Sequence, residues 1–198
     1  MTTTRIDFIR HGEPEGGSMY RGSAIDHPLS EKGWEQMRTA LGEACHWDVI
    51  VSSPLQRCLA FAEALGRKHH LPVETEQEFR EVGFGSWEGH TREEILAQDP
   101  EGYAAFYRDP VHCRPEGAEA LPAFGRRVAG AFERTLSRHS GQRILVVAHA
   151  GVIRAAMGHV LQTPPEAWYR VQVDNAGISR FQRTNGIDQL LFHNRSRI

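Results

Sequence analysis

The sequence predicts an α/β protein, a three-layer sandwich in which a mostly parallel sheet carries helices on both faces. Short apolar runs alternate with helical patterns along most of the chain, and this order is typical of a parallel sheet between helices. The run 143–148 is almost continuously apolar, as in strands that are buried on both faces. A length of 198 residues predicts one domain over 1–198, with an insertion.

The first third of the chain predicts two strands, each followed by a helix. Ile6–Ile9 is a short apolar run that indicates the first strand. After a loop rich in Gly and Pro, Ser30 is expected to cap a helix. Its buried face would carry Trp34, Met37, Leu41 and Ala44. Residues 48–52 indicate the second strand, and Ser53 and Pro54 then predict the cap and first turn of another helix. That helix would bury Leu55, Cys58, Leu59, Ala62 and Leu65.

The middle of the chain is less regular. Residues 72–75 favour a short edge strand. Thr91 and Glu94 have capping-box spacing, so a short helix is expected to begin there and to end before Asp99. A second short helical pattern contains Tyr103, Phe106 and Tyr107, and a loop follows over 109–117. We expect the segment 89–117 to be an insertion that covers one wall of a substrate site.

The last part of the chain predicts a long helix, a buried strand, a further helix and a strand-rich tail. Apolar residues recur at fours over 121–139, a pattern typical of an amphipathic helix. They are Phe124, Val128, Phe132 and Leu136. The strand 143–148 follows, and residues 152–161 resume a helical pattern. Strands are expected at 171–175, 178–182 and 190–193, some of them antiparallel.

Composition excludes several classes of protein. Hydrophobic residues make up 40% and charged residues 24%, which is ordinary for a soluble globular protein. The 25 acidic and 23 basic side chains leave a net charge of −2, which argues against a nucleic-acid partner. The three cysteines, Cys45, Cys58 and Cys113, are too widely spaced to indicate a disulfide framework. The sequence shows no signal peptide and no apolar run long enough for a membrane, so a cytoplasmic protein is expected.

Four segments with reactive side chains follow or lie near predicted strand ends. Residues 10–12 are Arg-His-Gly, residues 52–57 end in Arg57, residues 79–89 contain several carboxylates, and His149 follows the strand 143–148. Open α/β sheets collect their ligand-binding groups at the carboxyl ends of the strands. Arg57 would lie in the first turn of a helix, where the helix dipole disfavours a cation. An anionic partner at this edge of the sheet is therefore expected.

These motifs resemble the histidine phosphatase superfamily, the phosphoglycerate mutase-like group, whose Arg-His-Gly signature is matched by Arg10, His11 and Gly12. The resemblance covers nearly the whole chain, because the later motifs occur in the family's order. The runs 19–22, 27–30 and 85–89 are most similar to the α-ribazole phosphatase branch. The resemblance implies a hydrolase of small phosphomonoesters, with α-ribazole 5′-phosphate, a metabolite of cobalamin biosynthesis, as the substrate candidate.

The residue types suit transfer of a phosphoryl group. An imidazole can accept a phosphoryl group when it is unprotonated, and its pKa of about 6.5 makes that form accessible near neutral pH. We therefore expect His11 to be the nucleophile and to form a phosphohistidine. Arg10 and Arg57 would hold the phosphoryl oxygens, because a guanidinium offers a planar fork of donors. His149 would donate a hydrogen bond to the same group.

The leaving alkoxide needs a proton, which a carboxylic acid can supply. Position in the family's motif assigns this role to Glu81. The residues alone do not separate Glu81 from Glu78 or Glu88. Arg21 is a further candidate for substrate contact, and the alternative is a solvated loop arginine.

No cofactor and no metal are expected, because the chain lacks His-Glu-x-x-His and paired-cysteine spacing. Two other functions stay open. The chain could transfer the phosphoryl group as phosphoglycerate mutases do, although it is short for that group. Alternatively, it could be a regulatory module that binds phosphate without turnover.

Overall fold

The computed structural model describes residues 2–43 and 45–198, so the predicted core position Ala44 lies outside the described residues. Six strands form one mixed sheet in the order β3-β2-β4-β1-β5-β6. They are β1 (Thr3–Arg10), β2 (Val49–Ser52), β3 (Val73–Thr75), β4 (Arg143–Ala148), β5 (Ile178–Thr184) and β6 (Ile187–Arg195). The predicted α/β class is confirmed.

The strands β1 to β4 run parallel to one another, and the two neighbour pairs that include β5 are antiparallel. β4 lies between β1 and β2, with Ile6 opposite Ile144 and Val49 opposite the same Ile144. β5 runs antiparallel to β1, and β6 forms a hairpin with β5. β3 is an edge strand, as expected from its length. Because β1, β2 and β4 are parallel, their carboxyl ends meet at one edge of the sheet.

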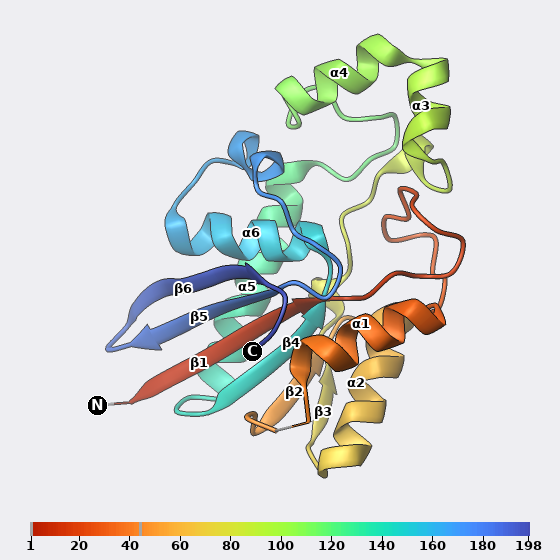
Figure 1. The fold of residues 1–198 in the computed structure, drawn as a ribbon. Coiled ribbons are helices and arrows are strands. Elements are labelled where there is room, and N and C mark those ends of the chain that lie inside the picture. The colour runs from red at the N-terminus through yellow and green to blue at the C-terminus, as the bar shows by residue number, and fades with distance from the viewer. Residues whose placement is uncertain (1, 44) are drawn as a thin grey trace.

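Helices cover both faces of the sheet (Figure 1). They are α1 (Glu31–Leu41), α2 (Gln56–His69), α3 (Arg92–Gln98), α4 (Pro100–Arg108), α5 (Leu121–Arg138) and α6 (Ala150–Leu161), with short 3-10 turns η1 (Gln77–Phe79), η2 (Gly85–Trp87) and η3 (Pro165–Arg170). α1 and α2 lie on one face, and α5 and α6 lie on the other. The pair α3 and α4, from the segment 89–117, stands apart from the sheet (Figure 1).

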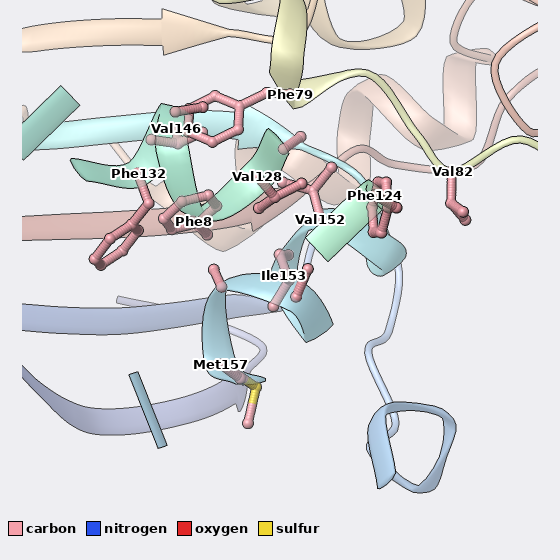
Figure 2. Close-up of a cluster of buried hydrophobic side chains, with 14 of the residues drawn as sticks. Phe8, Phe79, Val82, Phe124, Val128, Phe132, Val146, Val152, Ile153 and Met157 are labelled. Atoms are coloured by element: carbon pink, nitrogen blue, oxygen red, sulfur yellow. The ribbon is translucent and has the colours of Figure 1, made fainter. Parts of the chain in front are cut away.

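Alternating strand residues supply the two hydrophobic cores. Phe8 and Val146 face α5 and α6, where Phe8 packs edge-on against Phe79 and stacks on Phe132 (Figure 2). Ile9 and Val147 face α1 and α2. Successive strand side chains point to opposite faces, so each strand contributes to both cores.

Several predicted local signals are confirmed. The hydroxyl of Ser30 accepts a hydrogen bond from the backbone N–H of Gly33 at the start of α1. Thr91 and Glu94 form a capping box at the start of α3. Of the residues that the structure describes, no helix is both long enough and apolar enough to cross a membrane.

One predicted helix start and one predicted strand are wrong. α2 begins at Gln56 with Leu55 as its N-cap, so Ser53 and Pro54 lie outside the helix. Ser53 does not cap α2, because its hydroxyl accepts from the N–H of Leu55, outside the helix, and the N–H of Gln56 donates to the carboxylate of Asp26 instead. The Ser53 hydroxyl is also bonded to a histidine ring. Residues 171–175 are not a strand. The carbonyl oxygens of this segment accept hydrogen bonds from arginine and histidine side chains.

Candidate active site

A cavity of about 250 Å³ opens at the carboxyl edge of the sheet. β1 ends at Arg10, and His11 continues into the cavity wall. Arg57 reaches the cavity from the first turn of α2, and Glu81 reaches it from the segment after η1. The sheet topology thus brings together side chains that lie far apart in the sequence, since 71 residues separate Arg10 from Glu81 and 144 separate Arg10 from Arg154, which also lines the cavity.

The His11 ring is held in one orientation by its own backbone. Its Nδ1 lies 2.7 Å from the carbonyl oxygen of Gly12. A carbonyl can only accept, so Nδ1 carries the proton and Nε2 keeps its lone pair. Burial lowers the pKa of His11 well below 6.5, and the charges of Arg10 and Arg57 lower it further. The ring is therefore neutral and nucleophilic at neutral pH.

His149 lies directly beside His11, with ring centroids 5.2 Å apart. It is fully buried and does not line the cavity wall. Its Nε2 lies 2.7 Å from the Ser53 hydroxyl, which itself accepts a hydrogen bond from the backbone N–H of Leu55. The Ser53 hydroxyl can donate to Nε2, and in that arrangement the N–H of His149 is on Nδ1. Burial lowers the pKa of His149 well below 6.5, with a further lowering from Arg57.

Two predicted phosphate-binding arginines are held by backbone oxygens. Arg57 is only 1% exposed, and it donates to the carbonyls of Gly22 (2.8 Å) and Ile25 (2.9 Å). Arg10 donates to the carbonyl of Val173 (2.6 Å). Burial lowers the pKa of Arg10 to about 10, so it stays charged at neutral pH. Nε of both arginines is buried and has no partner within the described chain, which leaves donor capacity for an anion.

Glu81 is nearly buried, at 9% exposure, and lines the cavity. One carboxylate oxygen accepts from the backbone N–H of Val82 (2.9 Å), and the other accepts from Gly151 (3.2 Å). A Cβ atom at Gly151 would lie 2.3 Å from that carboxylate. The glycine after His149 is therefore required by the close approach of Glu81. Neither Glu78 nor Glu88 lines this cavity.

Arg21 lines the cavity but is not a solvated loop arginine, because it is only 7% exposed. It donates to the carbonyls of Glu15 (2.5 Å) and Gly17 (2.7 Å), and Nε lies 3.3 Å from His27. These contacts hold the loop after His11 in its fold. The structure therefore places Arg21 at the wall of the site chiefly as a support for that loop.

Sequence reasoning missed Arg154 and the tyrosines of the cavity wall. Arg154 lies on the same face of α6 as Ala150, at the i+4 spacing that could have revealed it. Its Nε donates to Val171 (2.9 Å), and its guanidinium lies over the ring of Tyr169. The tyrosines are Tyr20, Tyr107 and Tyr169. They come from three separate segments, so no local pattern indicates that they meet.

A second group of titratable side chains lies away from this cavity. Glu133, His159 and Asp188 have ligand atoms within 4.8 Å of one another, as in a metal site. Arg183 donates to both carboxylates, with contacts of 2.5 to 2.8 Å. The guanidinium already supplies the positive charge, so this group is an ion-pair network.

The family model of the histidine phosphatase superfamily (branch 1) matches residues 6–196. The chain belongs to this superfamily. The match covers the reactive segments of the cavity and the sheet except for the first three residues of β1, and the predicted resemblance is confirmed. The predicted class, a phosphoric monoester hydrolase, is confirmed by the named phosphatases among its relatives.

Known phosphatases are similar over most of the chain. The adenosylcobalamin/α-ribazole phosphatase of Escherichia coli K12 is 32% identical over 174 residues, which cover 86% of this chain and 85% of that protein. Phosphoserine phosphatase 1 of Hydrogenobacter thermophilus is 31% identical, with 88% of this chain and 84% of that protein covered. The crystal structure of the α-ribazole phosphatase from Shigella flexneri superposes with a TM-score of 0.81 at 30% identity, covering 98% of each chain.

Proposed function

We propose that this superfamily member hydrolyses a small phosphomonoester through a phosphohistidine on His11. The observation that carries the proposal is the pairing of a neutral His11 ring, with its Nδ1 proton donated to Gly12, and the charged guanidiniums of Arg10 and Arg57 at one cavity. A neutral imidazole supplies the electron pair, and the guanidiniums stabilise charge on the transferring oxygens. We call Arg10, His11 and Arg57, together with His149 directly behind His11, the phosphate end of the cavity.

The first step transfers the phosphoryl group to the enzyme. Nε2 of His11 attacks phosphorus in line with the ester oxygen, and the bond between phosphorus and that oxygen breaks. Arg10 and Arg57 donate hydrogen bonds to the phosphoryl oxygens, and His149, which lies behind the cavity wall, packs against the His11 ring. Glu81 gives its proton to the departing oxygen, which leaves as an alcohol.

The second step releases phosphate. Glu81, now ionised, takes a proton from a water molecule as the water oxygen attacks phosphorus. The bond between phosphorus and Nε2 of His11 breaks, and the electron pair returns to the ring. Inorganic phosphate leaves, and both residues regain their starting protonation states. No metal or cofactor enters this scheme.

The remaining wall contacts the substrate's alcohol. Glu81, Arg154 and the three tyrosines Tyr20, Tyr107 and Tyr169 form what we call the leaving-group end. Aromatic rings at this end suit an aromatic base, and the relatives include two enzymes named for α-ribazole. We infer that α-ribazole 5′-phosphate is the first substrate to test, against phosphoserine and 3-phosphoglycerate by kcat/KM. The segment 89–117 supplies Tyr107 to this end, which supports its proposed covering role.

We also propose that the protein is located in the cytoplasm. Its support is that Cys45, Cys58 and Cys113 are free thiols, as is usual in a reducing compartment.

The decisive experiment follows p-nitrophenyl phosphate hydrolysis in the presence of EDTA, and traps radiolabelled phosphate on the enzyme at alkaline pH. We expect His11→Ala to lose activity by at least about 10³-fold and to trap no acid-labile phosphate. His46→Ala, at an exposed histidine, is the matched control. Unchanged activity in His11→Ala would contradict the proposal. Phosphate binding by the wild type without turnover would instead support the regulatory module.

A further inference from the structure

Arg127, in the second turn of α5, uses all five of its N–H donors around the segment that carries Glu81. Nη1 donates to the carbonyls of Glu78 (2.6 Å) and Arg80 (3.0 Å). Nη2 donates to the carbonyl of Glu81 (3.2 Å). Nε and Nη2 also form a fork with the two carboxylate oxygens of Glu119, at 2.8 and 2.9 Å. A guanidinium has only these five donors, so the side chain is fully committed to this segment and to Glu119.

Glu119 extends the same set of contacts. One of its carboxylate oxygens accepts from the backbone N–H of Gly83 (3.2 Å), and its own N–H donates to the Gly83 carbonyl (3.1 Å). Burial, the largest single cause, raises the pKa of Glu119, but the hydrogen bonds and charge of Arg127, together with the N–H of Gly83 and the charge of Arg114, outweigh it and lower that pKa. The carboxylate is thus charged when it holds Arg127.

The segment 80–84 has no helix or strand to hold it. Helices and strands satisfy backbone carbonyls by their own hydrogen bonds, and buried carbonyls elsewhere need other donors. Here the guanidinium of Arg127 supplies those donors for two carbonyls of the segment, Arg80 and Glu81, and for Glu78 in the turn before it. Within the described residues, the side-chain oxygens of Glu81 are bonded only to backbone N–H groups, those of Val82 and Gly151. The position of its carboxylate therefore follows the position of the main chain.

We propose that Arg127 and Glu119 are positioning residues, which set the place of the Glu81 carboxyl group at the leaving oxygen. This inference rests on the proposed role of Glu81 as the proton donor. Proton transfer requires hydrogen-bond distance to the leaving oxygen, and a displacement of about 1 Å can cost a reaction roughly 10²-fold. Arg127 does not line the cavity, so it acts through Glu81.

Two aryl phosphates of similar size separate this role from a purely structural one. The nitrophenolate of p-nitrophenyl phosphate leaves readily without a proton, whereas the phenolate of phenyl phosphate depends more on the acid. We expect Arg127→Met to lower kcat/KM for phenyl phosphate by roughly 30-fold. For p-nitrophenyl phosphate the expected loss is less than about 5-fold, with inhibition by inorganic phosphate unchanged.

A matched control exists on the same helix. Arg134 pairs with Glu76 at 3.2 Å and its side chain is half exposed, whereas the hydrogen bonds to Glu78, Arg80 and Glu81 come from Arg127. Arg134→Met should leave both substrates within about twofold of the wild type. Arg127→Lys keeps the charge without the fork, so it should share the selective loss in weaker form. Glu119→Gln should do the same, and these two variants carry the test if Arg127→Met does not fold.

A double-mutant cycle completes the experiment. Glu81→Gln should show the same selectivity as Arg127→Met with a larger loss, and the double variant should lose no more than about twofold beyond Glu81→Gln on phenyl phosphate. The positioning role would be overturned if Arg127→Met lowered kcat/KM equally for both substrates. It would also be overturned if Arg127→Met caused its full loss again in the Glu81→Gln background. If Glu81→Gln itself affected both substrates equally, the proposed role of Glu81 would fail instead.

Discussion

At the phosphate end of the cavity, His11 and His149 directly follow β1 and β4, whereas at the leaving-group end Glu81 stands in a segment without helix or strand. The sheet register places the two histidine rings 5.2 Å apart. Side-chain hydrogen bonds from Arg127 hold the segment of Glu81. The positions of the two histidines therefore depend on the order and register of the strands. The position of Glu81 depends on hydrogen bonds from particular side chains.

Among the substitutions that compare the two ends, the largest effect is expected from Arg57→Lys, which keeps the positive charge and removes the planar fork. Because Arg57 also donates to Gly22 and Ile25, we expect kcat/KM to fall by roughly 10²- to 10³-fold. The loss should be the same for every phosphomonoester, since all share the phosphate end. Arg67→Lys, at an exposed arginine of the same helix, is the control. A loss confined to one substrate would break the distinction between the two ends.

Acid should destabilise the phosphate end through its buried histidines. The pKa of His11 and of His149 is lowered in the folded state by burial first and then by neighbouring arginines. The unfolded chain therefore binds more protons below about pH 6.5, and stability is lost as the pH falls from there toward the folded-state pKa values. Each histidine contributes at most about 1.4 kcal/mol per pH unit.

Urea unfolding at a series of pH values between 7.5 and 5 measures this dependence. His149→Gln should reduce its slope, and His46→Gln, at an exposed histidine, should leave the slope unchanged. An equal slope in the wild type and in His149→Gln would show that other groups control the acid sensitivity.

Gly33→Ala tests how closely the loop after His11 packs against α1. A Cβ atom at Gly33 would lie 2.1 Å from the backbone oxygen of Glu13, and one at Gly12 would lie 2.1 Å from the oxygen of Gly33. Because backbone atoms cannot move aside cheaply, we expect a loss of about 1–3 kcal/mol in the free energy of unfolding.

Gly130→Ala is the matched control for this substitution. In α5 the added methyl group would meet only the tip of Arg134, at 3.2 Å. Helix propensity should then stabilise the protein by up to about 1 kcal/mol. Thermal unfolding of both variants checks the pair, and similar losses would contradict the packing argument.

The smallest effect is expected at the leaving-group end, from Tyr107→Phe. The hydroxyls of Tyr20 and Tyr107 lie 2.8 Å apart and join the loop after His11 to α4. Removing one hydroxyl should cost about 1 kcal/mol or less, seen as a rise in KM for bulky substrates. Inhibition by inorganic phosphate should not change. A change in phosphate inhibition would mean that the two ends are coupled.

The same contrast explains how much of the molecule the sequence predicts. Parallel strands, the helix faces and the meeting of His11 with His149 follow from periodicity and strand ends, which are local signals. The hydrogen-bond partner of Ser53 cannot be predicted from local signals, since its hydroxyl bonds to a ring 96 positions away in the sequence. Its cap signal at α2 was therefore overridden by a distant partner.

Residues 171–175 were predicted as a strand for a related reason. Their apolar and β-branched character is real, but the carbonyls of Val171 and Val173 accept from Arg154 and Arg10. Long side chains from other elements thus replace a neighbouring strand. The role of Arg21 was also hidden, because its partners are backbone oxygens of a loop, whose fold no periodicity describes.

The location of Arg127 and Glu119 has a consequence for engineering. Both lie after the helical pair α3 and α4 in the chain, and Arg127 belongs to α5. An exchange of α3 and α4 for those of another superfamily member would therefore leave the hydrogen bonds of this anchor in place, provided that the packing of Phe106 on Phe84 and Trp87 is kept. Such grafts would alter which alcohols fit, and the proton donor would stay in place, so one scaffold can diversify its substrates without rebuilding its chemistry.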